Sequence, residues 1–281
     1  MTRSGRIGAR HIINLTLRLI GAWAWLWCWQ AFHTEAHCLV VLGMLVPVVF
    51  FVSLGLTENA LLRRRAILSA YLTTGSGLFR LLRGGVLLVT WQMLKAVLIA
   101  LILAVAALTW PTSTWQLLAA DALLLALLHT WLERRVANHA RPGLSGMFVR
   151  RILAPINTVV FSLVLAAATF YSPHPDLRIL TLSEAMLVEI TEVDARCEGV
   201  GVLARAAAAA DGANWWLAQS WLSHEEIARW ASIGWLAFLA LSAAFVWGYS
   251  RFLLGTLTSW PRLFGLLDRQ VLRGEPPTSR L

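Results

Sequence analysis

The stretch VLLVTWQMLKAVLIALILAVAAL, residues 86–108, decides the fold class of this chain. It carries a single charge, Lys95, and at 1.5 Å per residue a helix of this length crosses the roughly 30 Å hydrocarbon core of a bilayer. A helix satisfies its own backbone hydrogen bonds, which lipid requires of any spanning segment. The short alternating strands of an outer-membrane barrel do not occur. The stretch therefore predicts a transmembrane helix.

Similar apolar runs recur along the chain, at residues 12–32, 38–56, 115–132, 152–171 and 230–254. Over the 281 residues, 58% are hydrophobic and 14% are charged, whereas a soluble chain averages about 45–50% apolar and about 25% charged. Together these features predict an all-α integral membrane protein with six transmembrane helices.

The arginines predict its orientation. If the first segment is cytoplasmic and the sides alternate, the cytoplasmic regions hold 19 arginines and four acids, and the outer regions hold four arginines and ten acids. The positive-inside rule then predicts a multi-pass protein of a bacterial-type inner membrane with both termini in the cytoplasm. This placement, together with contact with anionic lipid headgroups, accounts for the net charge of +9. No basic domain is left over for nucleic acid.

These assignments divide the chain into nine segments. They are a cytoplasmic N-terminus (1–11), a first transmembrane hairpin (12–56), a basic amphipathic segment (57–85), a second hairpin (86–132), a basic loop (133–151), a fifth span (152–171), a small helical periplasmic subdomain (172–229), a sixth span (230–254) and a cytoplasmic tail (255–281).

The segment 57–85 predicts an amphipathic helix lying at the inner surface of the membrane, because its apolar residues recur at helical spacing. Two interpretations stay open. Its arginines are either a topology signal that snorkels to anionic lipid, or a docking site for a cytoplasmic partner. They are Arg63, Arg64, Arg65, Arg80 and Arg83.

The outer subdomain 172–229 predicts helices with thin apolar stripes. Thr181 and Glu184 have capping-box spacing, ahead of a stripe formed by Met186, Ile190, Val193 and Cys197. Gly199 and Gly201 should end that helix, and an alanine-rich helix should then run to Gly212. Ser223 and Glu226 form a second capping box. So small a piece buries too little to fold alone, and we expect it to lean on the membrane, on other outer loops or on another protein.

Polar residues inside predicted spans are candidates for functional residues. Each ionisable one costs about 2.5–3.5 kcal/mol to insert at the helix centre, and such a cost suggests a use. Folding the third and fourth spans back on each other places Lys95 near His129 and leaves Asp121 about 10 Å nearer the outer surface. With Asn157 of the fifth span, these residues suggest an ion or proton path. Alternatively, Lys95 snorkels and Asp121 sits close enough to the outer end to be hydrated.

The run CWQAFHTEAHC, residues 28–38, resembles a metal site in composition. The topology places it at the outer turn of the first hairpin, where three interpretations compete. It is a polar turn, or Cys38 forms a disulfide with Cys197 in an oxidising periplasm, or a metal or haem is bound. The ligands in the last case would come from His33, His37, His174 and His224.

The stretch Gly143-Leu144-Ser145-Gly146 resembles the serine motif of rhomboid proteases, which would make Ser145 a nucleophile. That chemistry needs a histidine base inside a later span. Residues 152–171 and 230–254 contain no histidine, and the topology places Ser145 in a cytoplasmic loop. No catalytic constellation is complete, so the sequence favours a protein that is not an enzyme.

Three classes of function therefore follow from the sequence. The first is a non-enzymatic component or scaffold of a multi-protein membrane assembly, with lipid and other membrane or periplasmic proteins as partners. The second is an ion or small-solute transporter or channel subunit that uses Lys95, Asp121 and His129. The third is a metal- or haem-binding membrane protein with its site at the outer face; no other cofactor is expected.

Overall fold

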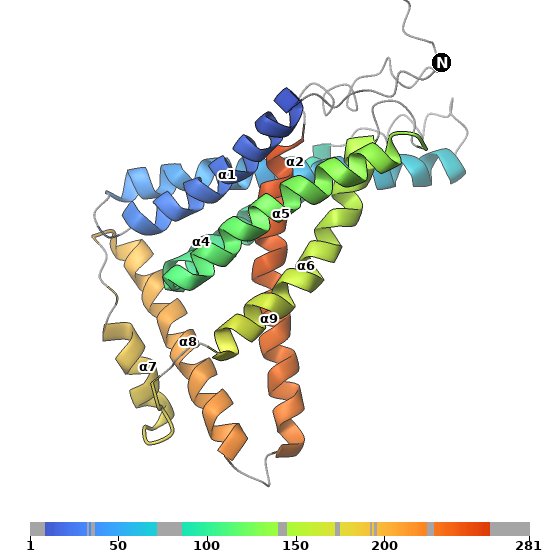
Figure 1. The fold of residues 1–281 in the computed structure, drawn as a ribbon. Coiled ribbons are helices and arrows are strands. Elements are labelled where there is room, and N and C mark those ends of the chain that lie inside the picture. The colour runs from blue at the N-terminus through green and yellow to red at the C-terminus, as the bar shows by residue number, and fades with distance from the viewer. Residues whose placement is uncertain are drawn as a thin grey trace, which may run out of the picture.

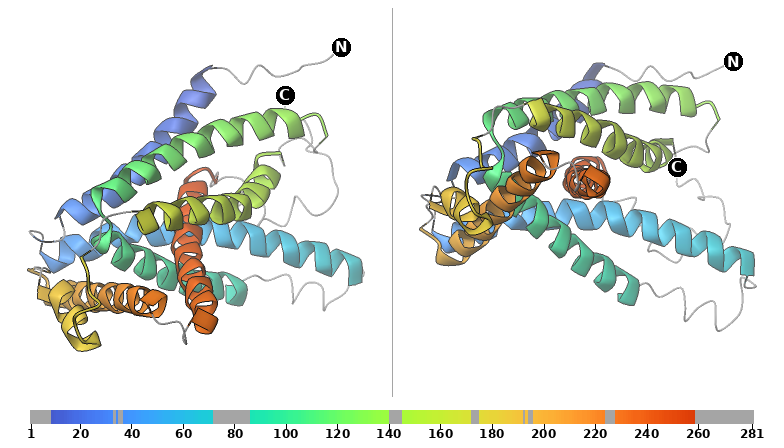
Figure 2. Two further views of the ribbon diagram at one scale, coloured as in Figure 1. Left: turned by 60° about the horizontal axis from the view of Figure 1, so that its bottom comes forward. Right: turned by 90° about the horizontal axis from the view of Figure 1, so that it is seen from below.

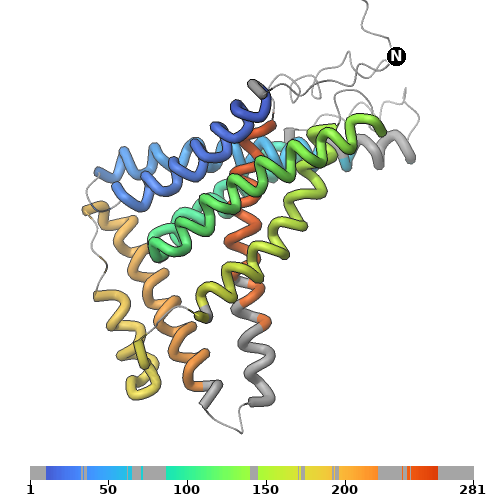
Figure 3. Tube along the Cα trace, viewed as in Figure 1, coloured from blue at the N-terminus to red at the C-terminus, as the bar shows by residue number. Residues whose placement is uncertain are grey.

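The computed structural model describes residues 9–32, 34, 37–71, 86–139, 145–171, 175–191, 193, 196–223 and 228–258 (Figure 1). Figure 3 also draws in grey the helical residues whose side chains are not described. Within these ranges all regular structure is helical. The helices are α1 (Ala9–Phe32), α2 (Cys38–Tyr71), α4 (Val86–Thr109), α5 (Thr112–Val136), α6 (Ser145–Tyr171), α7 (Leu182–Thr191), α8 (Glu198–Ser223) and α9 (Ala228–Thr256) (Figure 1).

Five of the described helices are long and apolar enough to cross a membrane: His11–Phe32, Cys38–Leu61, Leu87–Thr109, Thr112–Val136 and Ser145–Thr169. This confirms the prediction of an all-helical chain with several apolar spans. The sixth predicted span, residues 230–254, falls within α9, which is not among the five. The number of spans as six, and the sidedness, remain predictions.

Helix α9 occupies the centre of the arrangement. It packs against α1, α2, α4, α6 and α8, and Figure 2 shows it nearly end-on with α5 and α6 on one side and α2 on the other. The largest fully buried side chains include Tyr249 and Phe252 of α9, together with Leu19 and Leu118 from the helices around it. The hydrophobic core therefore lies around the second half of α9.

The crossing of α2 and α9 depends on glycine. The Cα of Gly255 lies 3.7 Å from the position that a Cβ on Gly55 would occupy, and a Cβ on Gly255 would overlap the carbonyl group of Phe51. Two backbones approach this closely only where a side chain is missing, as in the small-residue contacts of membrane helices.

Helix α2 continues past the predicted boundary at residue 56 and ends at Tyr71. The sequence from 57 to 71 contains no glycine or proline, and it is rich in Ala, Leu and Arg, which favour helix. Thr57, Glu58 and Leu61 are also buried, so packing fixes this part of the helix. Residues 57–71 thus continue helix α2 past its candidate span, Cys38–Leu61, and residues 72–85 lie outside the described residues.

Helices α4 and α5 do not form the packed hairpin expected for residues 86–132. They diverge from the turn at Pro111 (Figure 2). Helix α4 packs chiefly on α2, whereas α5 packs on α6 and α1. A short connection between two spans therefore does not make them partners in this fold.

The segment predicted to be periplasmic contains two antiparallel helices, α7 and α8, packed side by side (Figure 1). The predicted single stripe through Cys197 is wrong, because α7 ends at Thr191 and α8 begins at Glu198. Gly199 and Gly201 begin α8 instead of ending a helix. Gly212 lies inside α8, where a Cβ would come within 2.7 Å of the Ala185 carbonyl oxygen, so this glycine permits close packing against α7.

The predicted capping box at the start of α7 is present. The Thr181 backbone N–H and hydroxyl donate to Glu184 Oε2 at 2.7 and 2.8 Å, and the Glu184 N–H donates to Thr181 Oγ1 at 3.3 Å. The second capping box depends on Glu226, which lies outside the described residues.

Candidate functional site

A group of buried polar side chains joins α5, α6 and α9 in the middle of the bundle. Asp121, Asn157 and Ser250 are 2%, 5% and 0% exposed. The Asn157 side-chain amide donates to Asp121 Oδ2 at 3.1 Å and to Ser250 Oγ at 3.0 Å. An asparagine amide has two N–H donors, and both are used here. We refer to these three residues as the Asp121 group.

The other carboxylate oxygen of Asp121 has no hydrogen-bond partner among the described residues. The neighbouring Tyr249 hydroxyl does not reach it, since that hydroxyl donates to the Leu118 carbonyl at 2.7 Å. An ionised carboxylate with an unsatisfied oxygen is costly in a medium of low polarity. Chemically, the Asp121 group can therefore hold a proton on the carboxyl, or a small cation against the unsatisfied oxygen.

A cavity of about 430 Å³ lies between α1, α5 and α6, closer than Asp121 to the C-terminal end of α5. We refer to it as the His129 cavity. Its lining is mostly polar and mixes both signs of charge; the residues are His11, Asn14, Leu15, Arg18, His129, Glu133, Gly146, Arg150 and Leu257.

Within this cavity His129 is almost fully buried, and neither of its ring nitrogens makes a well-formed hydrogen bond to a described residue. Glu133 Oε2 lies 3.7 Å from His129 Nδ1 and 3.5 Å from His11 Nε2. These distances exceed the usual range for N–H···O hydrogen bonds, so one carboxylate is shared loosely by two imidazoles.

A buried ion pair borders the same cavity. Arg150 Nη2 of α6 donates to Glu58 Oε1 of α2 at 2.7 Å, and both side chains are at most one-tenth exposed. Thr258 donates a hydroxyl hydrogen bond to Glu58 Oε2 at 3.3 Å, and Arg150 Nη1 donates to the Leu257 carbonyl at 3.3 Å. The pair thus joins α2, α6 and the residues that follow α9.

Gly146 explains why α5 and α6 can meet at this cavity. A Cβ at this position would lie 3.2 Å from Glu133 Oε1 and 3.6 Å from Arg150 Nη1. The last glycine of the Gly143-Leu144-Ser145-Gly146 stretch therefore makes room for two charged side chains. The stretch that resembles the rhomboid serine motif thus has a packing role in this structure, through Gly146.

The structure brings two of the four predicted intramembrane residues into direct contact. Asp121 and Asn157 are hydrogen-bonded, and His129 lies on the same helix as Asp121 in the separate His129 cavity. Lys95 is apart from all three. It is exposed on the surface of α4, with its Nζ 5.2 Å from the centre of the Trp91 ring. The predicted proximity of Lys95 and His129 is wrong because α4 diverges from α5.

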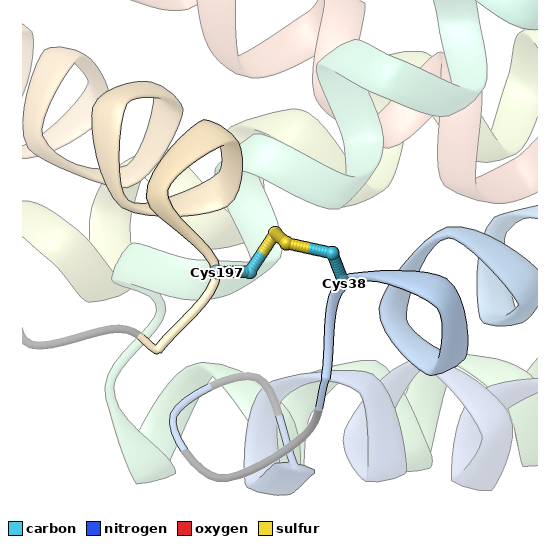
Figure 4. The surroundings of a disulfide bond; sticks show 2 residues. All are labelled: Cys38 and Cys197. Atoms are coloured by element: carbon cyan, nitrogen blue, oxygen red, sulfur yellow. A yellow bond between two sulfur atoms is a disulfide. The ribbon is translucent and has the colours of Figure 1, made fainter.

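Cys38 and Cys197 are joined by a disulfide in the structure, with Cα atoms 5.0 Å apart (Figure 4). This is the pair considered among the three interpretations of the 28–38 run. Cys197 is buried within the main hydrophobic core, and the backbone N–H of its neighbour Arg196 donates to the Thr34 carbonyl at 3.4 Å. The turn after α1 and the start of α8 are therefore held together at two adjacent points.

The predicted metal ligands are mostly beyond what the structure describes. His37 is exposed beside Cys38, and the other three, His33, His174 and His224, lie outside the described residues. Metal or haem binding stays a prediction, to be tested by elemental analysis and a visible spectrum of the purified protein. In the basic segment, Arg63 is exposed and Arg64 is half-buried. The side chain of Arg65 is not described, and Arg80 and Arg83 lie outside the described residues.

Sequence reasoning missed several members of these sites. Glu58 is the single acid among the arginines that follow residue 56, a signal that could have marked it as a buried partner. Tyr249, Ser250 and Arg251 form a polar run near the end of the sixth apolar stretch, a similar sign of polar neighbours. Glu133 and His11 carried no such signal, because both flank apolar runs where charged residues are ordinary.

The chain matches no protein-family model, no curated protein and no solved structure.

Proposed function

We propose that this chain is a non-enzymatic, multi-pass inner-membrane component that holds the outer helices α7 and α8 in a fixed position for other proteins of a membrane assembly. One observation carries the proposal. Helix α8 is fixed to α2 through Cys38 and Cys197 and packs on α4 and α9, while α7, on the far side of α8, exposes apolar side chains. On α7, Leu187 and Val188 are 57% and 43% exposed, and Ile179, in the turn that precedes α7, is 86% exposed.

The disulfide also supports the topology that this function needs. Two thiols can be joined only if both lie on the same side of the membrane, and four candidate spans separate Cys38 from Cys197. An even number returns the chain to the side it left. With α9 as the sixth span, the arginine-rich ends face the cytoplasm and its anionic lipids, and the cysteines face an oxidising compartment.

The buried polar residues fit a fixed framework. The Asp121 group links three helices, and the Glu58–Arg150 pair links two helices with the residues after α9. Polar side chains that bond across helices hold membrane bundles together. A framework of this kind can present an outer surface without a reaction of its own.

Photo-crosslinking in cells tests the proposal. A photoreactive amino acid at Ile179 or Leu187 should give discrete protein adducts, whereas the same residue at Leu123, which is exposed on α5 within a span, should give lipid adducts only. Stoichiometric partners should also co-purify in mild detergent. A monodisperse chain that purifies alone, with no protein adduct from α7, would contradict the proposal.

A second function is favoured by the unsatisfied oxygen of Asp121: transfer of a proton or small cation through the bundle, with the His129 cavity as its entrance. Lys95 has no place in this path, because it faces away on α4. The purified chain in sealed vesicles should then carry a proton or Na⁺ flux that Asp121→Asn abolishes and Lys95→Met leaves intact. Equal flux in the wild type and Asp121→Asn would rule this function out.

A further inference from the structure

A second cavity, of about 740 Å³, lies between α1, α2 and α9. We refer to it as the apolar cavity, because its lining is mainly aromatic and aliphatic; Leu17 and Trp25 of α1 and Pro47 of α2 are among its members. Its volume is in the range of pockets that bind a ligand. The proposed function makes no use of it.

Arg18 joins the apolar cavity to the His129 cavity. It is among the residues that line both, and the adjacent residues Leu257 and Thr258, which follow α9, line one cavity each. The two cavities are therefore neighbours, and one is mostly polar whereas the other is mainly apolar. A space of this kind fits a molecule that has a polar head and an apolar tail.

One face of α1 contributes to both cavities. His11, Asn14, Leu15 and Arg18 line the His129 cavity, and Arg18, Gly21, Ala22 and Trp25 line the apolar cavity. Steps of three and four residues put all of them on one side of the helix. This side changes from mostly polar to apolar at Arg18. The head of an occupant therefore lies towards the N-terminal end of α1, and its tail lies towards the C-terminal end.

The apolar cavity opens to the hydrocarbon phase. Leu17 lines it, is 65% exposed and lies within the candidate span His11–Phe32. A Cβ on Gly21 would meet nothing within 4 Å, so this part of α1 leaves open space. Farther along α1, Trp25 Nε1 donates to the Met44 carbonyl of α2 at 2.9 Å and connects the two helices. An acyl chain can therefore enter from the lipid and lie between α1 and α2.

The groups that an occupant can reach in the His129 cavity are hydrogen-bond donors. Arg18 and Asn14 are exposed, and neither makes a hydrogen bond or an ion pair with a described residue. His129 lines the same cavity, and its ring nitrogens lack hydrogen bonds to the described residues. Guanidinium and amide groups bind phosphate oxygens well, because they offer several N–H donors and the guanidinium also brings charge.

The acids described around this cavity already face cations or imidazoles. Glu133 Oε2 is buried, and two imidazoles lie 3.5 and 3.7 Å from it. The charge of Arg150 is balanced by Glu58 at 2.7 Å. Among the described lining residues, Arg18 therefore supplies the charge that has no partner, which matches a phosphodiester of charge −1. The cavity also lies at the helix ends that are predicted to be cytoplasmic, where basic pockets between spans bind anionic lipid headgroups.

From these features we infer that one anionic phospholipid binds across both cavities, with its phosphate near Arg18 and Asn14 and an acyl chain in the apolar cavity. The bound lipid connects α1 to α2 and α9. This site goes beyond the first proposed function. It is an alternative to the second, since a headgroup in the His129 cavity closes the entrance that a cation needs.

The test uses the full-length chain in vesicles of phosphatidylethanolamine and phosphatidylglycerol, doped with either lipid carrying a photoreactive acyl chain. The phosphatidylglycerol probe should label peptides containing residues 17–25 and 47–54 roughly fivefold more than the other probe, the factor expected for one arginine that attracts an anionic lipid. Arg18→Gln should remove this preference. Arg63→Gln, which changes an exposed arginine outside both linings, should keep it.

Two glycines give a matched comparison for the acyl chain. Gly21→Phe fills the apolar cavity and should lose most of the adducts, whereas Gly43→Phe, at an exposed position of α2 outside the lining, should keep them. A Cβ at either position meets nothing within 4 Å. An intact Cys38–Cys197 bond on a non-reducing gel shows that each variant has folded.

Inorganic phosphate separates a lipid site from a site for a free anion. Added in excess, with chloride at the same ionic strength as the control, it should leave the labelling unchanged, because a free anion gains nothing from the apolar cavity. The inference is overturned if phosphate removes the preference between the probes, if Arg18→Gln and Arg63→Gln label alike, or if folded Gly21→Phe labels as strongly as Gly43→Phe. Loss of protein adducts from α7 would count against the proposed function and leave these lipid results unaffected.

Discussion

At the scale of single residues, substitutions of Asp121 distinguish the effect of its charge on stability from the effect of its hydrogen bond. Asp121→Asn keeps an oxygen that can accept from Asn157 and removes an ionisable group, so we expect the free energy of unfolding in detergent to stay within about 0.5 kcal/mol of the wild type. Asp121→Leu removes the acceptor and should cost about 1–2 kcal/mol. Thermal unfolding of the purified variants measures both. Equal loss in the two variants would mean that the carboxylate itself is needed for packing.

For the buried pair of Glu58 and Arg150 we expect a larger effect on stability than for Asp121. Arg150→Met leaves the Glu58 carboxylate buried without its cation, and we expect a loss of about 3–5 kcal/mol in the free energy of unfolding. The double variant Glu58→Gln with Arg150→Met should recover much of it, since the unpaired charge is gone. Denaturant titrations in mixed micelles would measure the coupling. Additive losses in the double variant would contradict a direct pair.

At the scale of elements, the crossing of α2 and α9 predicts an asymmetry between two glycines. Gly255→Ala places a methyl group against the Phe51 backbone, which cannot give way, and should cost about 1–3 kcal/mol. Gly43→Ala, in α2, meets nothing within 4 Å and should be neutral or stabilising by up to about 1 kcal/mol. Unfolding midpoints of the two variants, measured side by side, test this. Similar midpoints would show that the two helices do not cross this closely.

The start of α7 should respond to pH. The Thr181 backbone N–H and hydroxyl both donate to Glu184, which lowers the pKa of this carboxyl below its ordinary value. A lowered pKa in the folded state stabilises the helix start above the ordinary pKa of glutamate, about 4.3, and this contribution is lost as the pH falls through the folded value. Hydrogen exchange of the α7 amides, corrected for intrinsic rates, should show less protection at the acidic end. Glu184→Gln should remove this pH dependence.

How far the sequence predicts these elements depends on how local each signal is. Long apolar runs are local signals, and five of the six predicted from them are candidate spans among the described residues. The Thr181–Glu184 spacing is also local, and its capping box is present. Helix ends set by packing are not local. Gly212 would ordinarily favour a helix end, yet α8 continues through it. A glycine is needed there because α7 passes too close to leave room for a side chain. Residue 56 ends no helix, because the side chains that follow it are buried by other elements.

The candidate site shows the same division. The cost of inserting polar groups marked Asp121, Asn157 and His129 from the sequence alone. The sequence could mark Ser250 and Glu58 as unusual polar positions but could not pair them with Asn157 and Arg150, because Ser250 is 93 residues from Asn157, and Arg150 is 92 residues from Glu58. The predicted proximity of Lys95 and His129 was wrong for the same reason. Its position along α4 was known, but the direction in which α4 leaves Pro111 depends on α2, against which it packs.

At the scale of the whole molecule, the disulfide predicts which side of the membrane the outer region faces. In a Cys28→Ser background, the chain should not react with a membrane-impermeant maleimide added to intact spheroplasts, because both remaining cysteines are bonded. Adding Cys197→Ser should expose Cys38 to labelling from outside. Labelling of Cys38 only after the cells are broken would reverse the orientation.

The separation of the two cysteines by 159 residues also bears on how the protein is made. Cys38 leaves the ribosome early and waits as a thiol while α2, α4, α5 and α6 are synthesised and inserted. Its partner emerges only after those helices, at the start of α8. The bond therefore records the order of synthesis: it can form only after α2, α4, α5 and α6 have been made, because Cys197 follows all four helices in the chain.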